Sequence, residues 1–135
     1  MKSKNIGFIA SSTNEAQEAL SELKKIYRNI KPSKADVIVA LGGDGLLLHA
    51  LETYGKDGIP VYGMNKGTVG FLLNNYSKLD LFERIEKAEV TEVNPLIMEA
   101  IDIKNKSYKG LAINEVSLLR QSRMTAKISI NINEK

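Results

Sequence analysis

The sequence predicts an α/β protein: a Rossmann-like parallel sheet domain, followed by the start of an all-β, sandwich-like domain. The apolar run at 37–41 (VIVAL) has no polar alternation, which is typical of a strand buried on both faces of a parallel sheet. A glycine turn at 42–45 (GGDG) and a Leu- and Ala-rich, helix-favouring run follow it directly. Later in the chain the helical spacing disappears. We therefore expect an α/β domain at 1–90 and the incomplete beginning of a β domain at 91–135.

The first third of the chain predicts a strand, a helix and a right-handed crossover to the central strand. Residues 5–10 form the expected strand, and Ser12 with Glu15 fits a capping box at the start of the helix. Pro32 and Ser33 end the connection. The helix carries its apolar residues at helical spacing: Ala16, Ala19, Leu20, Leu23 and Ile26 or Tyr27.

The GGDG turn is the first candidate site. Ligands of open α/β sheets bind at the carboxyl ends of strands, and exposed amides at a helix start attract phosphate. The backbone of Gly42 and Gly43 would cradle phosphate, and Asp44 is the one carboxylate among the glycines. The alternative is an ordinary Asp-Gly hairpin turn, which would need alternating flanks that the sequence lacks.

A second glycine-rich loop follows the third expected strand. The strand is expected at residues 60–64, after a loop at 55–58. The glycine-rich loop is the segment 65–72 (NKGTVGFL), at the carboxyl end of this strand. Two such loops from neighbouring strands could form the walls of one crevice. A helix is expected to begin around Ser77 and Asp80 and to run to about Ala88 with Leu81 and Ile85 on its buried side.

The last 40 residues read as extended chain. We expect strands at 96–103 and 108–119, separated by a turn at 104–107, and a half-buried antiparallel strand at 125–132, where apolar and polar residues alternate. Three such strands do not make a self-sufficient β domain. The expectation is that the chain is truncated or that another chain covers these strands.

Composition narrows the function classes. The chain has 135 residues, no cysteine and one histidine, which excludes thiolate and multi-histidine metal sites; no metal ligand is predicted. The net charge of +3 comes from scattered Lys and Arg, which argues against nucleic acid as a partner. The sequence shows no signal-peptide core and no stretch of transmembrane length, so we expect a cytoplasmic protein without a membrane partner.

Three motifs together resemble the N-terminal part of bacterial-type NAD kinases. They are LGGDG at 41–45, GMNKGTVGFL at 63–72 and AINEVSL at 112–118, in the order and at the spacing of that family. GGDG by itself is shared with diacylglycerol and sphingosine kinases and with 6-phosphofructokinases. The other two motifs are far more specific.

The resemblance implies a phosphotransferase. Such an enzyme transfers the γ-phosphoryl group of ATP, or in some members of inorganic polyphosphate, to the 2′-hydroxyl of the adenosine ribose of NAD, giving NADP. It also implies Mg²⁺ or another divalent cation as cofactor, NAD and ATP as ligands, and a homodimer or homotetramer.

The resemblance also implies roles for individual residues. Asp44 would be the proton acceptor for the ribose hydroxyl. The implied nucleotide-binding residues are Gly45, His49, Phe71, Leu72, Asn114 and Glu115. Without the resemblance, the Asn-Glu pair reads as a strand end or turn, and His49 as a structural histidine. Phe71 and Leu72 are expected to be core residues whether or not they touch a ligand.

Two other functions compete with this one. A lipid kinase would share the GGDG turn, but the loop at 63–72 and the absence of a basic amphipathic surface argue against it. A non-catalytic nucleotide-binding fragment is the other alternative. Because a further glycine- and threonine-rich segment of NAD kinases is missing here, we expect the 135-residue chain alone to have little or no kinase activity.

Overall fold

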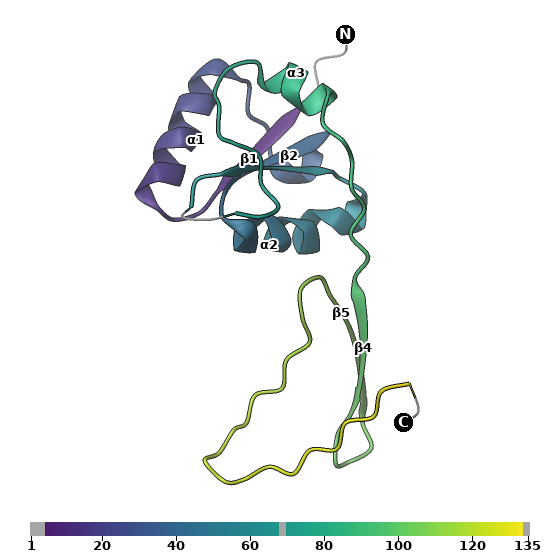
Figure 1. Ribbon diagram of the computed structural model, residues 1–135. Helices are drawn as coiled ribbons and strands as arrows, with labels where there is room; N and C mark the ends of the chain where they lie inside the picture. Colours follow the sequence, from purple (N-terminus) through teal and green to yellow (C-terminus); the bar gives the residue numbers. More distant parts are fainter. Residues whose placement is uncertain (1–4, 68–69, 134–135) are drawn as a thin grey trace.

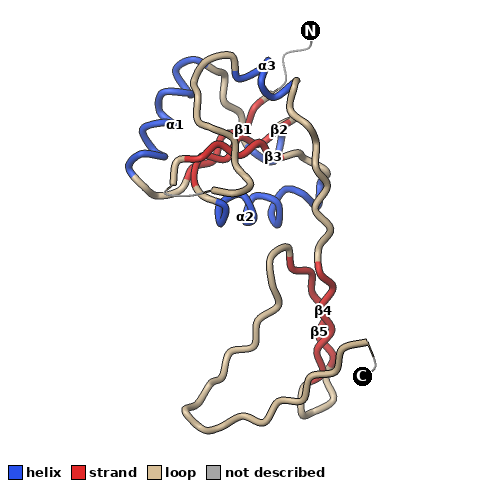
Figure 2. Tube along the Cα trace, in the orientation of Figure 1, coloured by secondary structure: helices blue, strands red, loops and turns tan. Residues whose placement is uncertain are grey.

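The computed structural model describes residues 5–67 and 70–133; the centre of the second glycine loop, residues 68–69, lies outside them. Figures 1 and 2 show an α/β part that contains the three parallel strands, and a long two-stranded hairpin beyond it. The predicted fold class is confirmed.

The parallel sheet has the order β1-β2-β3. Its strands are β1 (Ile6–Ala10), β2 (Val37–Gly42) and β3 (Val61–Asn65). Every residue of β2 is buried, as expected for a central strand covered on both faces. The register pairs Gly42 with Asn65, so the two glycine-rich turns leave the sheet side by side.

Helices cover both faces of this sheet. The helices α1 (Asn14–Ile26) and α3 (Leu81–Glu86) lie on one face, and α2 (Asp44–Tyr54) lies on the other (Figure 1). The main core cluster joins side chains of α1 and α3 to alternate residues of β2, among them Leu23, Leu81 and Val39.

The predicted start of α1 is wrong. Thr13, not Ser12, is the N-cap residue, and no side chain caps the helix. The reason is that the chain is still tied to the sheet at this point: the Ser11 amide donates to the Leu41 carbonyl at 3.0 Å, so the helix begins later. Of the two residues offered for the end of the buried face, Tyr27 packs against the core and Ile26 is exposed.

A segment that we call the strap, residues 70–80, runs from the second glycine loop to α3 (Figure 2). Asn74 holds it to β3: its amide donates to the Gly63 carbonyl at 2.9 Å, and its carbonyl accepts from the Asn65 amide at 2.8 Å. Leu73 lies against Gly63, where a Cβ atom would overlap its side chain. The strap therefore extends the sheet by one bridge without being a strand.

Side chains of α1 hold the far end of the strap. Glu22 accepts hydrogen bonds from the Tyr76 hydroxyl at 3.1 Å and the Lys78 ammonium at 3.3 Å. The Tyr27 hydroxyl donates to the Lys78 carbonyl at 3.0 Å. Burial and, after it, the hydrogen bond to Glu22 raise the pKa of Tyr76 to about 12, whereas the bonds from Lys78 and Tyr76 lower the pKa of Glu22.

The C-terminal part differs from the prediction. The hairpin consists of β4 (Leu96–Ile101) and β5 (Ser107–Ala112), so the strand expected to reach residue 119 ends at 112. Residues 125–132 do not form a strand, and their side chains are exposed. Apolar and polar residues do alternate in this segment. Within the described residues, however, no strand pairs with it and no surface covers its isoleucines.

We expect Gly63→Ala to cost about 1–3 kcal/mol of unfolding free energy, because the new methyl group would displace Leu73 and with it the strap. Urea unfolding measures this. The double variant Gly63→Ala/Leu73→Ala should recover part of the loss. Gly55→Ala is the matched control, because its Cβ would meet open space. A similar loss in both single variants would contradict this account.

The Tyr76 hydroxyl should lose its proton at a higher pH than an ordinary tyrosine. Titration by phenolate absorbance should show a tyrosine ionising near pH 12 that is missing in Tyr76→Phe. Because the folded pKa lies above the usual 10, the neutral hydroxyl stabilises the fold fully below pH 10, and this contribution is lost as the pH rises through about 12.

Glu22→Gln separates the two causes of the raised Tyr76 pKa, which are burial and the hydrogen bond to Glu22. It should lower the pKa of Tyr76 only part of the way toward 10, since burial, the larger cause, remains. Circular dichroism at each pH checks that the fold persists. An unchanged pKa in Glu22→Gln would rule out the hydrogen bond as a cause.

Candidate functional site

The two glycine-rich turns meet at the carboxyl edge of the sheet. The Lys66 amide donates to the Gly42 carbonyl at 2.9 Å, and a Cβ on Gly67 would lie 3.4 Å from the Gly43 Cα. Gly42 itself is tightly enclosed, since its Cβ would lie 3.0 Å from the Leu46 side chain. The two loops are therefore in direct backbone contact.

Gly43 and Gly45 leave the backbone of the turn uncovered. A Cβ on either residue would meet no atom within 4 Å, and neither has a positive φ. Glycine is thus not required here by the conformation of the turn. Its effect is to leave open space at the first turn of α2, where backbone amides point outward and an anion can approach.

Asp44 joins the two loops. It is half-buried at the first position of α2, and its carboxylate accepts the Phe71 amide on Oδ2 at 3.0 Å and the Leu72 amide on Oδ1 at 3.2 Å. Hydrogen bonds to a charged acceptor are stronger than neutral ones, and a carboxylate at a helix N-terminus is favoured by the helix dipole. This contact joins the start of α2 directly to the end of the second glycine loop.

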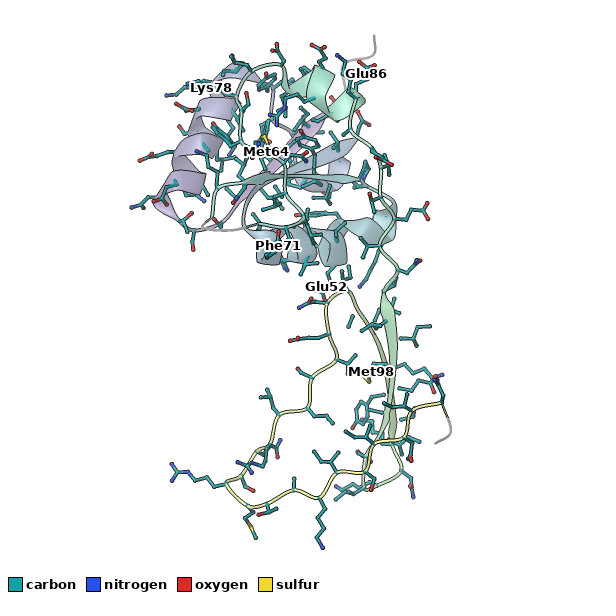
Figure 3. All side chains as sticks on the ribbon, viewed as in Figure 1. Glu52, Met64, Phe71, Lys78, Glu86 and Met98 are labelled. Carbon is teal, nitrogen blue, oxygen red and sulfur yellow. The ribbon has the colours of Figure 1, made fainter. Side chains whose placement is uncertain are left out.

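The interpretation of Phe71 and Leu72 as core residues is wrong. Phe71 is 90% exposed and Leu72 is 58% exposed. The physical reason is the contact with Asp44: the two amides face the carboxylate, and the side chains are left exposed. Figure 3 shows Phe71 beside α2. An exposed phenyl ring beside the turn is available to a ligand with a flat, apolar face.

A groove brings together four of the predicted nucleotide-binding residues. It has a volume of about 500 Å³ and lies between α2 and the segment that follows β5. Gly45 and His49 line it from α2, and Asn114 and Glu115 line it from the other side. Phe71 and Leu72 lie outside it.

Sequence reasoning missed five lining residues: Leu48 and Glu52 on α2, and 111–113 at the end of β5 and just after it. For the two on α2 a signal existed, because Gly45, His49 and Glu52 recur at the spacing of one helix face. Glu52 lies where α2 approaches the end of β5 (Figure 3). The side chains of His49, Asn114 and Glu115 are exposed, so the groove is open to solvent.

Within residues 5–67 and 70–133, no three His, Cys, Asp or Glu side chains gather to hold a metal ion. No helix there is long and apolar enough to cross a membrane.

Comparison with known proteins confirms the resemblance. The model of the ATP-NAD kinase N-terminal domain matches residues 1–93. The chain is 50% identical to the NAD kinase of Caulobacter vibrioides over 130 residues, which are 96% of this chain and 50% of that protein. It is 46% identical to the NAD kinase of Rhizobium meliloti over 134 residues, 99% of this chain and 52% of the relative.

The NAD kinase of Cereibacter sphaeroides matches the full chain at 48% identity, over 53% of its own length. The chain thus spans about half the length of the curated relatives it matches. With the family model covering more than half of its residues, the chain belongs to the ATP-NAD kinase family.

Proposed function

We propose that this chain provides the NAD-binding cleft and the proton-accepting carboxylate of an NAD kinase, which phosphorylates the 2′-hydroxyl of the adenosine ribose of NAD to give NADP. The observation that carries the proposal is the groove that brings Gly45 and His49 together with Asn114 and Glu115, beside Asp44 at the start of the same helix. Relatives named NAD kinase support it.

Asp44 is suited to act as the base. An ionised carboxylate has about four acceptor positions, and the Phe71 and Leu72 amides occupy one on each oxygen. The remaining positions can accept a ribose hydroxyl, while the two amides keep the carboxylate from rotating. As the ribose oxygen bonds to the γ-phosphorus, its proton passes to Asp44, the bond to the β–γ bridging oxygen breaks, and ADP leaves.

The other residues would bind and orient the nucleotide. Glu115, when ionised, accepts hydrogen bonds from ribose hydroxyls, and Asn114 can both donate and accept. The open backbone at Gly43, next to Gly42, suits a phosphate group. The exposed Phe71 ring and Leu72 are placed where an adenine could pack.

Phosphoryl transfer of this kind also involves a donor and a cation. ATP is the proposed donor and polyphosphate the alternative donor. Mg²⁺ or another divalent cation would neutralise charge on the phosphate oxygens when bound. We further propose a cytoplasmic homodimer or homotetramer that binds neither nucleic acid nor membranes.

The domain boundary is proposed near residue 91. The end of the family match at residue 93 and the change from mixed α/β to antiparallel structure support it. The lipid-kinase alternative is not favoured, because the matched relatives are named NAD kinase.

Calorimetric titration of NAD into the 135-residue chain, with size-exclusion chromatography of the same sample, tests the cleft. We expect saturable binding, and Asn114→Ala should weaken it about tenfold or more through loss of its hydrogen bonds. Asn131→Ala, an exposed asparagine outside the groove, is the control. Equal affinity for Asn114→Ala and the wild type would place the NAD site elsewhere.

Asp44→Asn separates chemistry from binding. The assay uses this chain extended by the further β region that NAD kinases carry, because little activity is expected from the 135 residues alone. With ATP and Mg²⁺, NADP formation by the extended chain should fall by about 10²–10⁴-fold, because the amide cannot take the proton. The asparagine also has only one acceptor oxygen for the two strap amides, so NAD affinity must be measured alongside to show that the cleft persists. Undiminished turnover in this variant would remove Asp44 from the role of base.

A further inference from the structure

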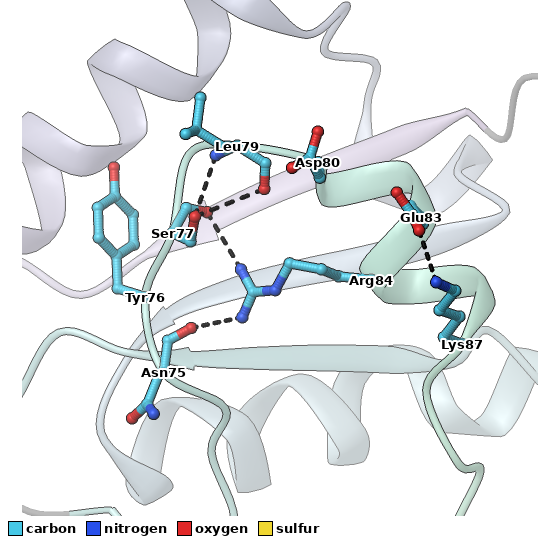
Figure 4. A pocket seen from close by; sticks show the side chains of 8 residues that line it. All are labelled: Asn75, Tyr76, Ser77, Leu79, Asp80, Glu83, Arg84 and Lys87. Carbon is cyan, nitrogen blue, oxygen red and sulfur yellow. Dashed lines mark hydrogen bonds and ion pairs between the residues drawn. The ribbon is translucent and has the colours of Figure 1, made fainter.

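A second pocket, of about 400 Å³, lies at the other end of the strap, between residues 75–80 and α3 (Figure 4). Arg84 reaches across it from α3. Its Nη2 atom donates to the Asn75 carbonyl at 2.6 Å, and its Nη1 atom donates to the Ser77 carbonyl at 3.3 Å. Nη1 also contacts the Met64 sulfur of β3 at 3.6 Å. This arginine thus binds the backbone of its own chain.

The guanidinium group suits this task better than any other side chain. It is planar and carries several donors in a fixed fork, so it can hold two carbonyls that are two residues apart in one geometry. It also lies 5.9 Å from the centroid of the buried Tyr62 ring, which ties it to the sheet. The neighbouring Glu83 is paired with Lys87 at 2.6 Å, so this carboxylate does not draw the guanidinium away from the strap.

The strap connects this pocket to Asp44 over a very short distance. The Leu72 amide is bonded to Asp44, and the Asn75 carbonyl, three residues further on, is bonded to Arg84. Between them Leu73 and Asn74 are held against Gly63. Three residues of extended chain span only about 10 Å, which leaves little slack between the two contacts.

We propose that Arg84 is a positioning residue for Asp44: by fixing the Asn75 and Ser77 carbonyls, it sets the strap so that the Phe71 and Leu72 amides hold the carboxylate in one orientation. The proposal rests on the proposed function only in taking Asp44 as the reacting carboxylate. The pocket beside α3 thereby affects the orientation of the Asp44 carboxylate, although it does not line the groove.

Amide hydrogen exchange of the free 135-residue chain, followed by NMR, tests the link without any nucleotide. In Arg84→Ala we expect exchange at Phe71 and Leu72 to accelerate about tenfold or more, while the amide of Val39 in the central strand keeps its rate. Added guanidinium at millimolar concentration should restore part of the protection. Arg120→Ala, which removes an exposed arginine that does not line this pocket, should leave both loop amides unchanged.

Two results would overturn the proposal. One is unchanged exchange at Phe71 and Leu72 in Arg84→Ala. The other is equal acceleration at Val39, which would mean that Arg84 only stabilises the fold. If Arg84→Ala does not fold, Arg84→Lys replaces it: it keeps the charge but loses the fork, and the same selective acceleration is expected. A chain that passes this test but does not bind NAD would contradict the proposed function and leave the mechanical link standing.

Discussion

The hydrogen bonds between the Asp44 carboxylate and two amides that lie 27 and 28 residues further along the chain are the contact on which the site depends. They tie the first turn of α2 to the strap, and the strap in turn is held to Gly63 by Leu73 and Asn74. The same contact turns the side chains of Phe71 and Leu72 outward. One carboxylate thus joins α2 to the strap and, in the proposed reaction, takes the proton.

The α/β part could be predicted because its signals are local. The unbroken apolar run of β2 indicates burial on both faces, and a glycine turn followed by helix-forming residues places α2. What could not be predicted depends on partners far away in the sequence. Phe71 and Leu72 look like core residues until the position of Asp44 is known, and the alternation at 125–132 indicates an apolar face without indicating what surface would cover it.

The groove of the candidate site could be predicted in part. The resemblance named Gly45, His49, Asn114 and Glu115, and the structure brings them to one groove. Leu48 and Glu52 could have been found by asking which residues share a helix face with Gly45. Arg84 carried no signal at all, because a cation on a short helix rich in charged residues has the pattern of an ordinary solvent-exposed residue.

The order of the elements along the chain has a consequence for biosynthesis. All pairings of the parallel sheet, the strap and α3 are complete by residue 86, and the hairpin that leads to Asn114 and Glu115 comes afterwards. Ribosomes add about 5–20 residues per second from the N-terminus. The α/β part therefore has a few seconds to fold as an emerging unit, and Asp44 is already held by its two amides when the second wall of the groove leaves the exit tunnel.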